Sequence, residues 1–195
     1  MVEKLINTFE ELKKYIFVVS RKDKGYIYIT FHNDNFYHLV GLHKIKNFDS
    51  YFPAHIKSKD KRYKYIKKNP NKFNHILENQ TKEKDLLKLR ISTFSNILDL
   101  LKGFNTSLYS LKYKSNHSLY DGDYGLMKMY EEDVCCLLGL KKESKEDKKI
   151  YCFPNSWMAS NRINRLVEFK RPIYMENISM IPSEIYNESV DNICI

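Results

Sequence analysis

The sequence has no long apolar run, and this absence limits where the protein can reside. No stretch approaches the roughly 20 apolar residues that a membrane-spanning helix needs. The N-terminal stretch, MVEKLINTFEELKKY, combines charged residues with an apolar stripe, so it lacks the uninterrupted apolar core of a secretory signal peptide. We therefore expect a cytoplasmic protein with no membrane contact.

Cysteine is scarce, and the four thiols of Cys135, Cys136, Cys152 and Cys194 are not spaced as metal ligands usually are. The adjacent pair at 135 and 136 points in opposite directions in an extended chain, so it cannot clamp one ion as a C-x-x-C motif does. In a cytoplasmic protein such cysteines are most often reduced and buried. The sequence indicates no metal site and no cofactor.

Acidic residues are the minority: 33 Lys and Arg face 24 Asp and Glu, which gives a formal net charge of +9. A hydrophobic content of 43% supplies enough apolar side chains for a core and excludes a disordered chain. The positive excess favours polyanionic partners, nucleic acid before membrane. A genome biased towards lysine codons is the alternative explanation, and clustering of the charge distinguishes the two.

The charge is indeed clustered. KSKDKRYKYIKK, residues 57–68, carries seven basic residues against one Asp, whereas residues 183–195 are acidic. Basic side chains can grip phosphates and tyrosine rings can stack on bases, although a lysine run can equally be a solvated face. The residues predicted to bind nucleic acid are Lys61, Arg62, Tyr63, Lys64, Tyr65, Lys67 and Lys68.

Hydrophobic periodicity places helices first and strands later. Apolar residues at helical spacing predict helices over 3–14, 36–45 and 71–102, the last ending at Gly103. β-Branched and aromatic runs predict a hairpin of 15–20 with 25–31, and residues 57–68 read as a loop or loose helix. From residue 107 the pattern changes to short strand-like runs separated by turns.

We therefore expect one domain, 1–195, of the α+β class. N-terminal helices and a hairpin would pack on a C-terminal antiparallel β-meander of about four strands. The basic stretch near 47–70 reads as an insertion, and 183–195 reads as an acidic tail.

The stretch NDNFYHLVGLHK, residues 33–44, contains the first candidate site residues. On a regular helix His38 and His43 lie about 140° apart, so they cannot both point into one pocket. His43 shares the apolar face, which is typical of a core histidine, whereas Asp34 is placed to orient the ring of His38. Gly41 costs about 1 kcal/mol of helix stability, which indicates close approach by another backbone or by a ligand.

Two further polar residues stand in apolar surroundings. Arg90 lies within an apolar helical arc, where a guanidinium needs a carboxylate or a phosphate as partner. Ser156 lies in a strand-like run, FPNSWM, where packing requires no hydroxyl. Histidine, a cation and a hydroxyl are the usual parts of metal-independent ribonucleases, in which the RNA 2′-hydroxyl attacks. The histidine moves the proton, and the cation stabilises the anionic phosphorane.

Four segments, NFYHLVGLHK, KLRISTFSNILDLL, YGLMKMY and IYCFPNSWM, resemble in order the phage-associated barnase–EndoU–colicin–RelE-like (BECR-fold) nuclease domains, in particular their fourth group. The resemblance covers about 26–181. It implies helices packed on a four-stranded antiparallel sheet, and a metal-independent ribonuclease of phage or mobile-element origin acting in the bacterial cytoplasm. It also implies RNA as partner, with tRNA one candidate, and an immunity protein or another host or phage protein as a further candidate.

Carried over by position, the resemblance makes His38 the general acid or base and matches Gly41 to the glycine of the family. Arg90 becomes the phosphate-stabilising cation, and Ser156 becomes a hydrogen bonder to the phosphate. His43 and Lys44 are second-rank catalytic candidates.

The sequence is also compatible with two other functions. A non-enzymatic phage protein could use the basic face to bind and inhibit a host defence complex, such as a CRISPR nuclease, or to bind nucleic acid. A metal-dependent nuclease could use Glu168-x-Lys170, but it also needs a strand aspartate, and the aspartates at 121, 123 and 133 all fall in expected turns. A sealed His38 would favour the inhibitor. Convergence of His38 and Arg90 with a lysine or hydroxyl on an open surface would favour the ribonuclease.

Overall fold

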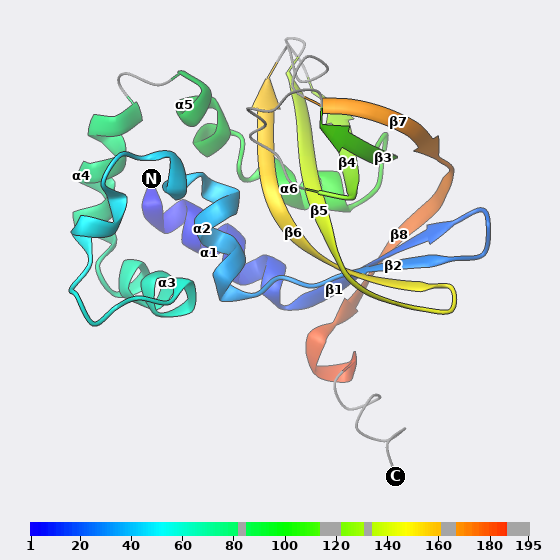
Figure 1. Cartoon of the computed structure of the whole chain (residues 1–195), viewed down its shortest axis with the longest axis horizontal. Helices are drawn as coiled ribbons and strands as arrows, with labels where there is room; N and C mark the ends of the chain where they lie inside the picture. The colour runs from blue at the N-terminus through cyan, green and yellow to red at the C-terminus, as the bar shows by residue number, and fades with distance from the viewer. Residues whose placement is uncertain (82–84, 114–121, 131–133, 161–166, 187–195) are drawn as a thin grey trace.

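The computed structural model describes residues 1–81, 85–113, 122–130, 134–160 and 167–186. In this part of the chain a group of helices from the first half packs against a curled sheet (Figure 1). The helices are α1 (Val2–Lys13), α2 (Asn33–Val40), η1 (Leu42–Lys44), η2 (Phe48–Tyr51), α3 (Lys59–Lys68), α4 (Pro70–Thr81), α5 (Asp85–Ser92) and α6 (Asn96–Leu101). The strands are β1 (Tyr15–Arg21), β2 (Tyr26–Ile29), β3 (Ser107–Tyr113), β4 (Tyr124–Met129), β5 (Cys135–Glu146), β6 (Lys149–Ser160), β7 (Val167–Ile173) and β8 (Met175–Pro182).

The α+β class is confirmed, but the expected meander of about four strands is wrong. The strands form one eight-stranded sheet in the order β7-β3-β4-β5-β6-β2-β1-β8. The N-terminal hairpin belongs to this sheet, because β2 pairs in parallel with β6, with Ile27 opposite Ile150. Alternation of apolar and polar residues predicts strands but does not predict which strands pair. The pairing of β2 with β6 joins segments more than a hundred residues apart.

The sheet curls because its two edges are consecutive in the chain. β7 pairs with β3 at one end of the strand order, and β8 pairs with β1 at the other. Only Tyr174 separates β7 from β8. Figure 1 shows the chain crossing from one edge to the other over this short connection.

Most of the expected helices are present, with different boundaries. The first is confirmed as α1, and the hairpin is confirmed as β1 and β2. The block expected over 71–102 is divided into α4, α5 and α6. Gly103 follows the last of these with φ of +80°, a left-handed conformation that terminates a helix as predicted. The basic stretch forms α3, whose Tyr63 and Ile66 are buried in the core.

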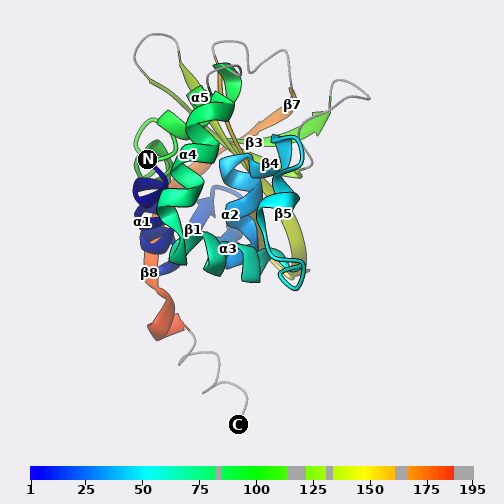
Figure 2. The ribbon, with the colours of Figure 1, turned by 90° about the vertical axis from the view of Figure 1, so that its left-hand side faces the viewer.

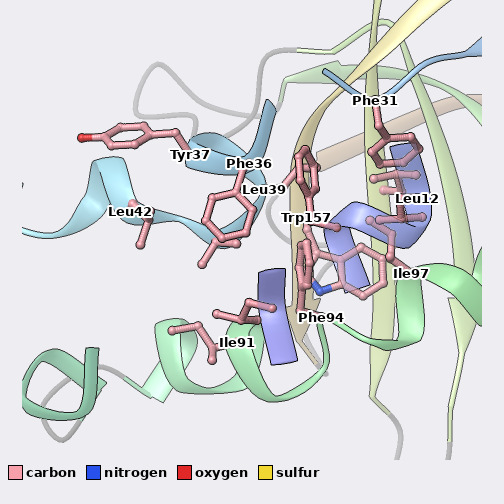
Figure 3. Close-up of a cluster of buried hydrophobic side chains, with 14 of the residues drawn as sticks. Leu12, Phe31, Phe36, Tyr37, Leu39, Leu42, Ile91, Phe94, Ile97 and Trp157 are labelled. Carbon is pink, nitrogen blue, oxygen red and sulfur yellow. The ribbon is translucent and has the colours of Figure 1, made fainter. Parts of the chain in front are cut away.

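One hydrophobic core joins the helices to the sheet. Figure 3 shows its centre, where Trp157 of β6 lies close to Leu39 of α2 and to Phe94 in the turn between α5 and α6. The indole N–H of Trp157 donates to Thr93 Oγ1 at 3.3 Å, so the buried ring keeps a polar partner. This packing holds α2 and α5 against the same strand. Figure 2 shows the helices side by side in front of the sheet.

No helix in the described ranges is long and apolar enough to cross a membrane.

Candidate active site

The candidate site begins where α2 ends. The helix was expected to continue to Ile45, but it stops at Val40, because Gly41 adopts φ of +86° and ψ of +21°. The Gly41 N–H still donates to the carbonyl of His38, at 3.1 Å, and the next turn, η1, starts in a new direction. Gly41 is therefore the terminating residue of a helix, in a conformation that other residues reach only at a cost.

This break brings the two histidines together. The predicted separation of about 140° assumed a continuous helix, whereas the ring centroids of His38 and His43 lie 4.8 Å apart with 48° between their planes. Tyr37 lies beside both rings, with centroids 6.0 Å from His38 and 6.4 Å from His43. His43 is exposed, so its expected role as a core histidine is wrong, and His38 is half-buried.

The ring of His38 faces a lysine that the sequence did not single out. Lys59 Nζ, at the first residue of α3, lies 2.6 Å from His38 Nε2. An ammonium has three donors and no acceptor, so Nε2 accepts and the ring carries its proton on Nδ1. The expected partner, Asp34, makes no hydrogen bond to this ring among the described residues. No local signal predicts this contact, because it joins residues 21 positions apart.

Arg90 lies directly beneath the helix end. Only 7% of the residue is exposed, and Nη1 donates to the His38 carbonyl at 3.4 Å. A Cβ placed on Gly41 would lie 2.8 Å from the same nitrogen, so glycine also makes room for this guanidinium. None of the described carboxylates forms an ion pair with Arg90. Arg90 thus binds the negative end of the α2 dipole and leaves its charge otherwise unneutralised.

In the described part of the chain, the fully buried polar atoms without a hydrogen bond are Arg21 Nε, Arg62 Nε and Ser156 Oγ. The remaining nitrogens of Arg90 are absent from that group, so each of them is hydrogen-bonded or in contact with solvent. A small anion above the histidines would therefore lie close to a buried positive charge.

The positive charges perturb one another. Burial first, and then the charges of Lys59 and Arg90, lower the pKa of His38. The pKa of His43 falls to about 4, through burial and through the charges of His38, Lys44 and Arg90, although solvent around this exposed ring screens part of the effect.

The pKa values of Arg90 and Lys44 are lowered as well. Burial lowers the pKa of Arg90 to about 10, and burial together with Arg90 lowers the pKa of Lys44 to about 8. At neutral pH the site therefore consists of neutral imidazoles surrounded by cations. Because cations close together repel, the arrangement favours an anion.

Ser156 is not brought to this site. It pairs with Gly139 on β5, and its neighbour Met158 packs with Leu137 in a separate cluster on the face of the sheet that points away from Trp157. Trp157 points towards the helices, so the preceding residue of a strand points to the opposite face. Ser156 Oγ is buried and has no hydrogen-bond partner in the described residues. Ser156 therefore does not reach the histidine pair.

The predicted nucleic-acid-binding residues divide into two groups. Tyr63 is 2% exposed and packs against Phe9 and Phe36, so its ring is not available to stack on a base. Arg62 donates to Asp49 at 2.7 Å and lies over the rings of Tyr37 and Phe52, which makes it a clamp between α2, η2 and α3.

The other residues of this helix are more open. Tyr65 is half-buried against Phe52 and Phe73. Besides Lys59, the exposed lysines of α3 are Lys61, Lys64, Lys67 and Lys68, of which Lys64 pairs with Asp60 and Lys67 with Glu10. These lysines lie on the same helix as Lys59, the residue that contacts His38.

The residues of a metal-dependent mechanism are only partly described. Asp123 accepts from the Lys142 N–H at 2.8 Å, whereas the positions 121 and 133 and the side chains of Glu168 and Lys170 lie outside the described residues. Within the described ranges, no three His, Cys, Asp or Glu side chains gather in a way that could hold a metal ion.

Fold and site together define an α+β protein whose helices and curled sheet present a histidine pair in a cationic setting. A family model described as phage-Barnase-EndoU-ColicinE5/D-RelE like nuclease 4 matches residues 3–187. The chain belongs to this nuclease family, as the resemblance in its sequence indicated. Searches of the curated proteins and of the solved structures find no significant match.

Proposed function

We propose that the protein is a metal-independent ribonuclease of phage or mobile-element origin that cleaves RNA through attack by the 2′-hydroxyl. The observation that carries the proposal is the convergence of His38 and His43, 4.8 Å apart, with Lys59 and Arg90 beside them and no carboxylate paired to either cation among the described residues. Membership in a nuclease family supports a phosphodiester as the substrate.

Each residue has a chemical role in this proposal. The histidines move protons to and from the ribose and the leaving group, because a neutral imidazole can accept a proton near neutral pH. Arg90, Lys44 and Lys59 supply positive charge where the phosphorane becomes more negative than the bound phosphate. Arg90 acts mainly through its buried charge, since only 7% of the residue is exposed.

Binding of RNA is assigned to the exposed lysines of α3. Lys61, Lys64 and Lys68 recur at helical spacing, so they lie on one side of the helix that starts at Lys59. They lie about 140–200° around the helix axis from Lys59, so they would hold RNA on the outer side of α3, next to the site and not within it. Each phosphate contact releases counterions, so affinity for RNA should fall steeply with salt.

The direct test is cleavage of total bacterial RNA and of a defined oligoribonucleotide in EDTA. We expect products ending in a 2′,3′-cyclic phosphate and a 5′-hydroxyl, and no cleavage where a 2′-deoxyribose replaces the ribose at the cut. His38→Ala and His43→Ala should each lower the rate about 100-fold or more. His75→Ala is the matched control, because its side chain is 83% exposed on α4.

Three outcomes would overturn the proposal. Equal cleavage by wild type and both histidine variants would indicate a contaminating nuclease. Salt-dependent binding of RNA with no cleavage by any form would leave the other candidate, a binding protein that inhibits a host complex. Cleavage only after addition of a divalent cation would favour a metal-dependent reaction instead.

A further inference from the structure

The two histidines of the site differ in their hydrogen-bond partners, and this difference indicates a different catalytic role for each. Nε2 of His38 is already engaged, 2.6 Å from Lys59 Nζ. Among the described residues no hydrogen bond joins a cation to His43, whose ring lies beside the rings of His38 and Tyr37. One histidine therefore shares a proton with an ammonium, while the other has a ring nitrogen free to accept one.

We infer that Lys59 and His38 together form the general acid of the reaction and that His43 is the general base. This inference rests on the proposed ribonuclease function. It assigns a catalytic role to Lys59, a residue that neither the sequence pattern nor the family resemblance indicated.

The distance supports a shared proton. Two nitrogen bases 2.6 Å apart can only hold one proton between them, because two positive charges so close would repel strongly in a half-buried site. That proton lies at the surface, since Lys59 is exposed and His38 is half-buried. Arg90, which donates to the backbone carbonyl of His38, adds a second positive charge, which favours release of the proton to an oxygen that is becoming negative.

His43 is suited to the opposite role. A neutral imidazole has one N–H and one acceptor nitrogen, and among the described residues no cation is hydrogen-bonded to His43, so its acceptor nitrogen can take a proton. Burial first, and then the charges of His38, of Lys44 on the same turn and of Arg90, lower the pKa of His43 to about 4. They keep the imidazole neutral at physiological pH, and a base must start the reaction in this form.

The step balances without any further reactant. The 2′-hydroxyl gives its proton to His43 as the 2′-oxygen bonds to phosphorus. The bond from phosphorus to the 5′-oxygen breaks, and that oxygen takes the proton shared by Lys59 and His38. The products are a 2′,3′-cyclic phosphate and a 5′-hydroxyl, and the site returns to its starting state when solvent carries a proton from His43 to the acid.

The test compares two dinucleotide substrates that differ in the leaving atom. One has the natural 5′-oxygen, and the other has sulfur in its place, which leaves without being protonated. The variants are Lys59→Met, Lys59→Arg and His43→Ala, with Lys4→Met as the control because it removes an exposed lysine from another helix. Thermal melts establish that each variant is folded.

We expect Lys59→Met and Lys59→Arg to cleave the oxygen substrate about 100-fold more slowly and the sulfur substrate within a few fold of wild type. The arginine keeps the positive charge but does not release its proton, so kcat should fall while KM changes little. His43→Ala should be slow on both substrates, because the base is needed whatever the leaving atom is. Lys4→Met should match wild type on both.

Other results would overturn the inference. If the Lys59 variants lose the same factor on both substrates, Lys59 only binds the phosphate, while the proposed ribonuclease function stands. If sulfur rescues His43→Ala and not the Lys59 variants, the acid and base are reversed. If the wild type cleaves neither substrate, the inference falls together with the ribonuclease function.

Discussion

Gly41 provides the most demanding test of the candidate site, because both its conformation and its surroundings exclude a side chain. The perturbation is Gly41→Ala, a single added methyl group. With φ of +86°, the backbone of residue 41 is in the left-handed region, and this conformation costs an alanine about 1–2 kcal/mol. The new Cβ would also lie 2.8 Å from Arg90 Nη1, 3.0 Å from Arg90 Cδ and 3.3 Å from Leu87 Cδ1.

The second cost depends on whether Arg90 can move. Its side chain is packed, with 7% of the residue exposed, so relief requires displacement of a buried guanidinium and costs about 1–3 kcal/mol, as overpacking of a core does. Alanine also reduces the conformational freedom of the unfolded chain, and this offsets about 0.4–1 kcal/mol of the destabilisation. We expect Gly41→Ala to lower the free energy of unfolding by about 2–4 kcal/mol.

Gly103→Ala is the matched control. Gly103 has φ of +80°, but a Cβ there meets Ile178, with Cγ1 at 3.2 Å and the backbone N at 3.4 Å, far from the histidines in the chain. It carries the same backbone cost and a milder contact, so it should lower the free energy of unfolding by about 1–2 kcal/mol. Urea unfolding followed by circular dichroism measures both values.

The two variants should also differ in activity. Gly41 lies between His38 and His43, so a shift of the chain there separates the rings, and RNA cleavage should fall at least tenfold under conditions where the variant is folded. Gly103→Ala should cleave as wild type does. Equal unfolding free energies for Gly41→Ala and wild type, or equal activities for the two alanine variants, would refute the reasoning about this helix end.

Three further predictions concern charge. Although burial alone would raise the pKa of Glu10, its bonds to Lys13, Tyr63 and Lys67 lower that pKa to about 2. A lowered carboxyl pKa adds stability above the unfolded value of about 4.5, and this is lost as the pH falls towards 2. Glu10→Gln should therefore cost about 1 kcal/mol at pH 7, discounted for solvent exposure, and almost nothing at pH 2, as urea titrations at both values would reveal. With the pKa of His43 lowered to about 4, the folded state binds fewer protons than the unfolded state between that value and about 6.5, so stability falls as the pH drops through this window. His43→Asn should flatten that slope, and an unchanged slope would contradict the assignment. Arg62→Met should lower the free energy of unfolding by about 2 kcal/mol through loss of the Asp49 bond and the contacts with Tyr37 and Phe52. Lys61→Met, its exposed neighbour, should be neutral, and equal effects of the two would mean that Arg62 is not a clamp.

The sequence by itself determined the local elements and the family. The apolar stripe of α1, the alternation in β1 and β2, and the stop at Gly103 depend on neighbours within a few residues, so their patterns are legible in the chain. The four quoted segments indicated the nuclease family that the match over residues 3–187 establishes.

Only the tertiary structure decided how the site is assembled. A glycine after an apolar helical stretch is compatible both with a helix that continues and with a helix that ends there. The helix ends at Gly41, where the side chain of Arg90 packs closely against the glycine. The approach of Lys59 to His38 and the parallel pairing of β2 with β6 join residues distant in the chain. Such contacts depend on which faces meet after folding, and periodicity records which face is apolar without recording what covers it.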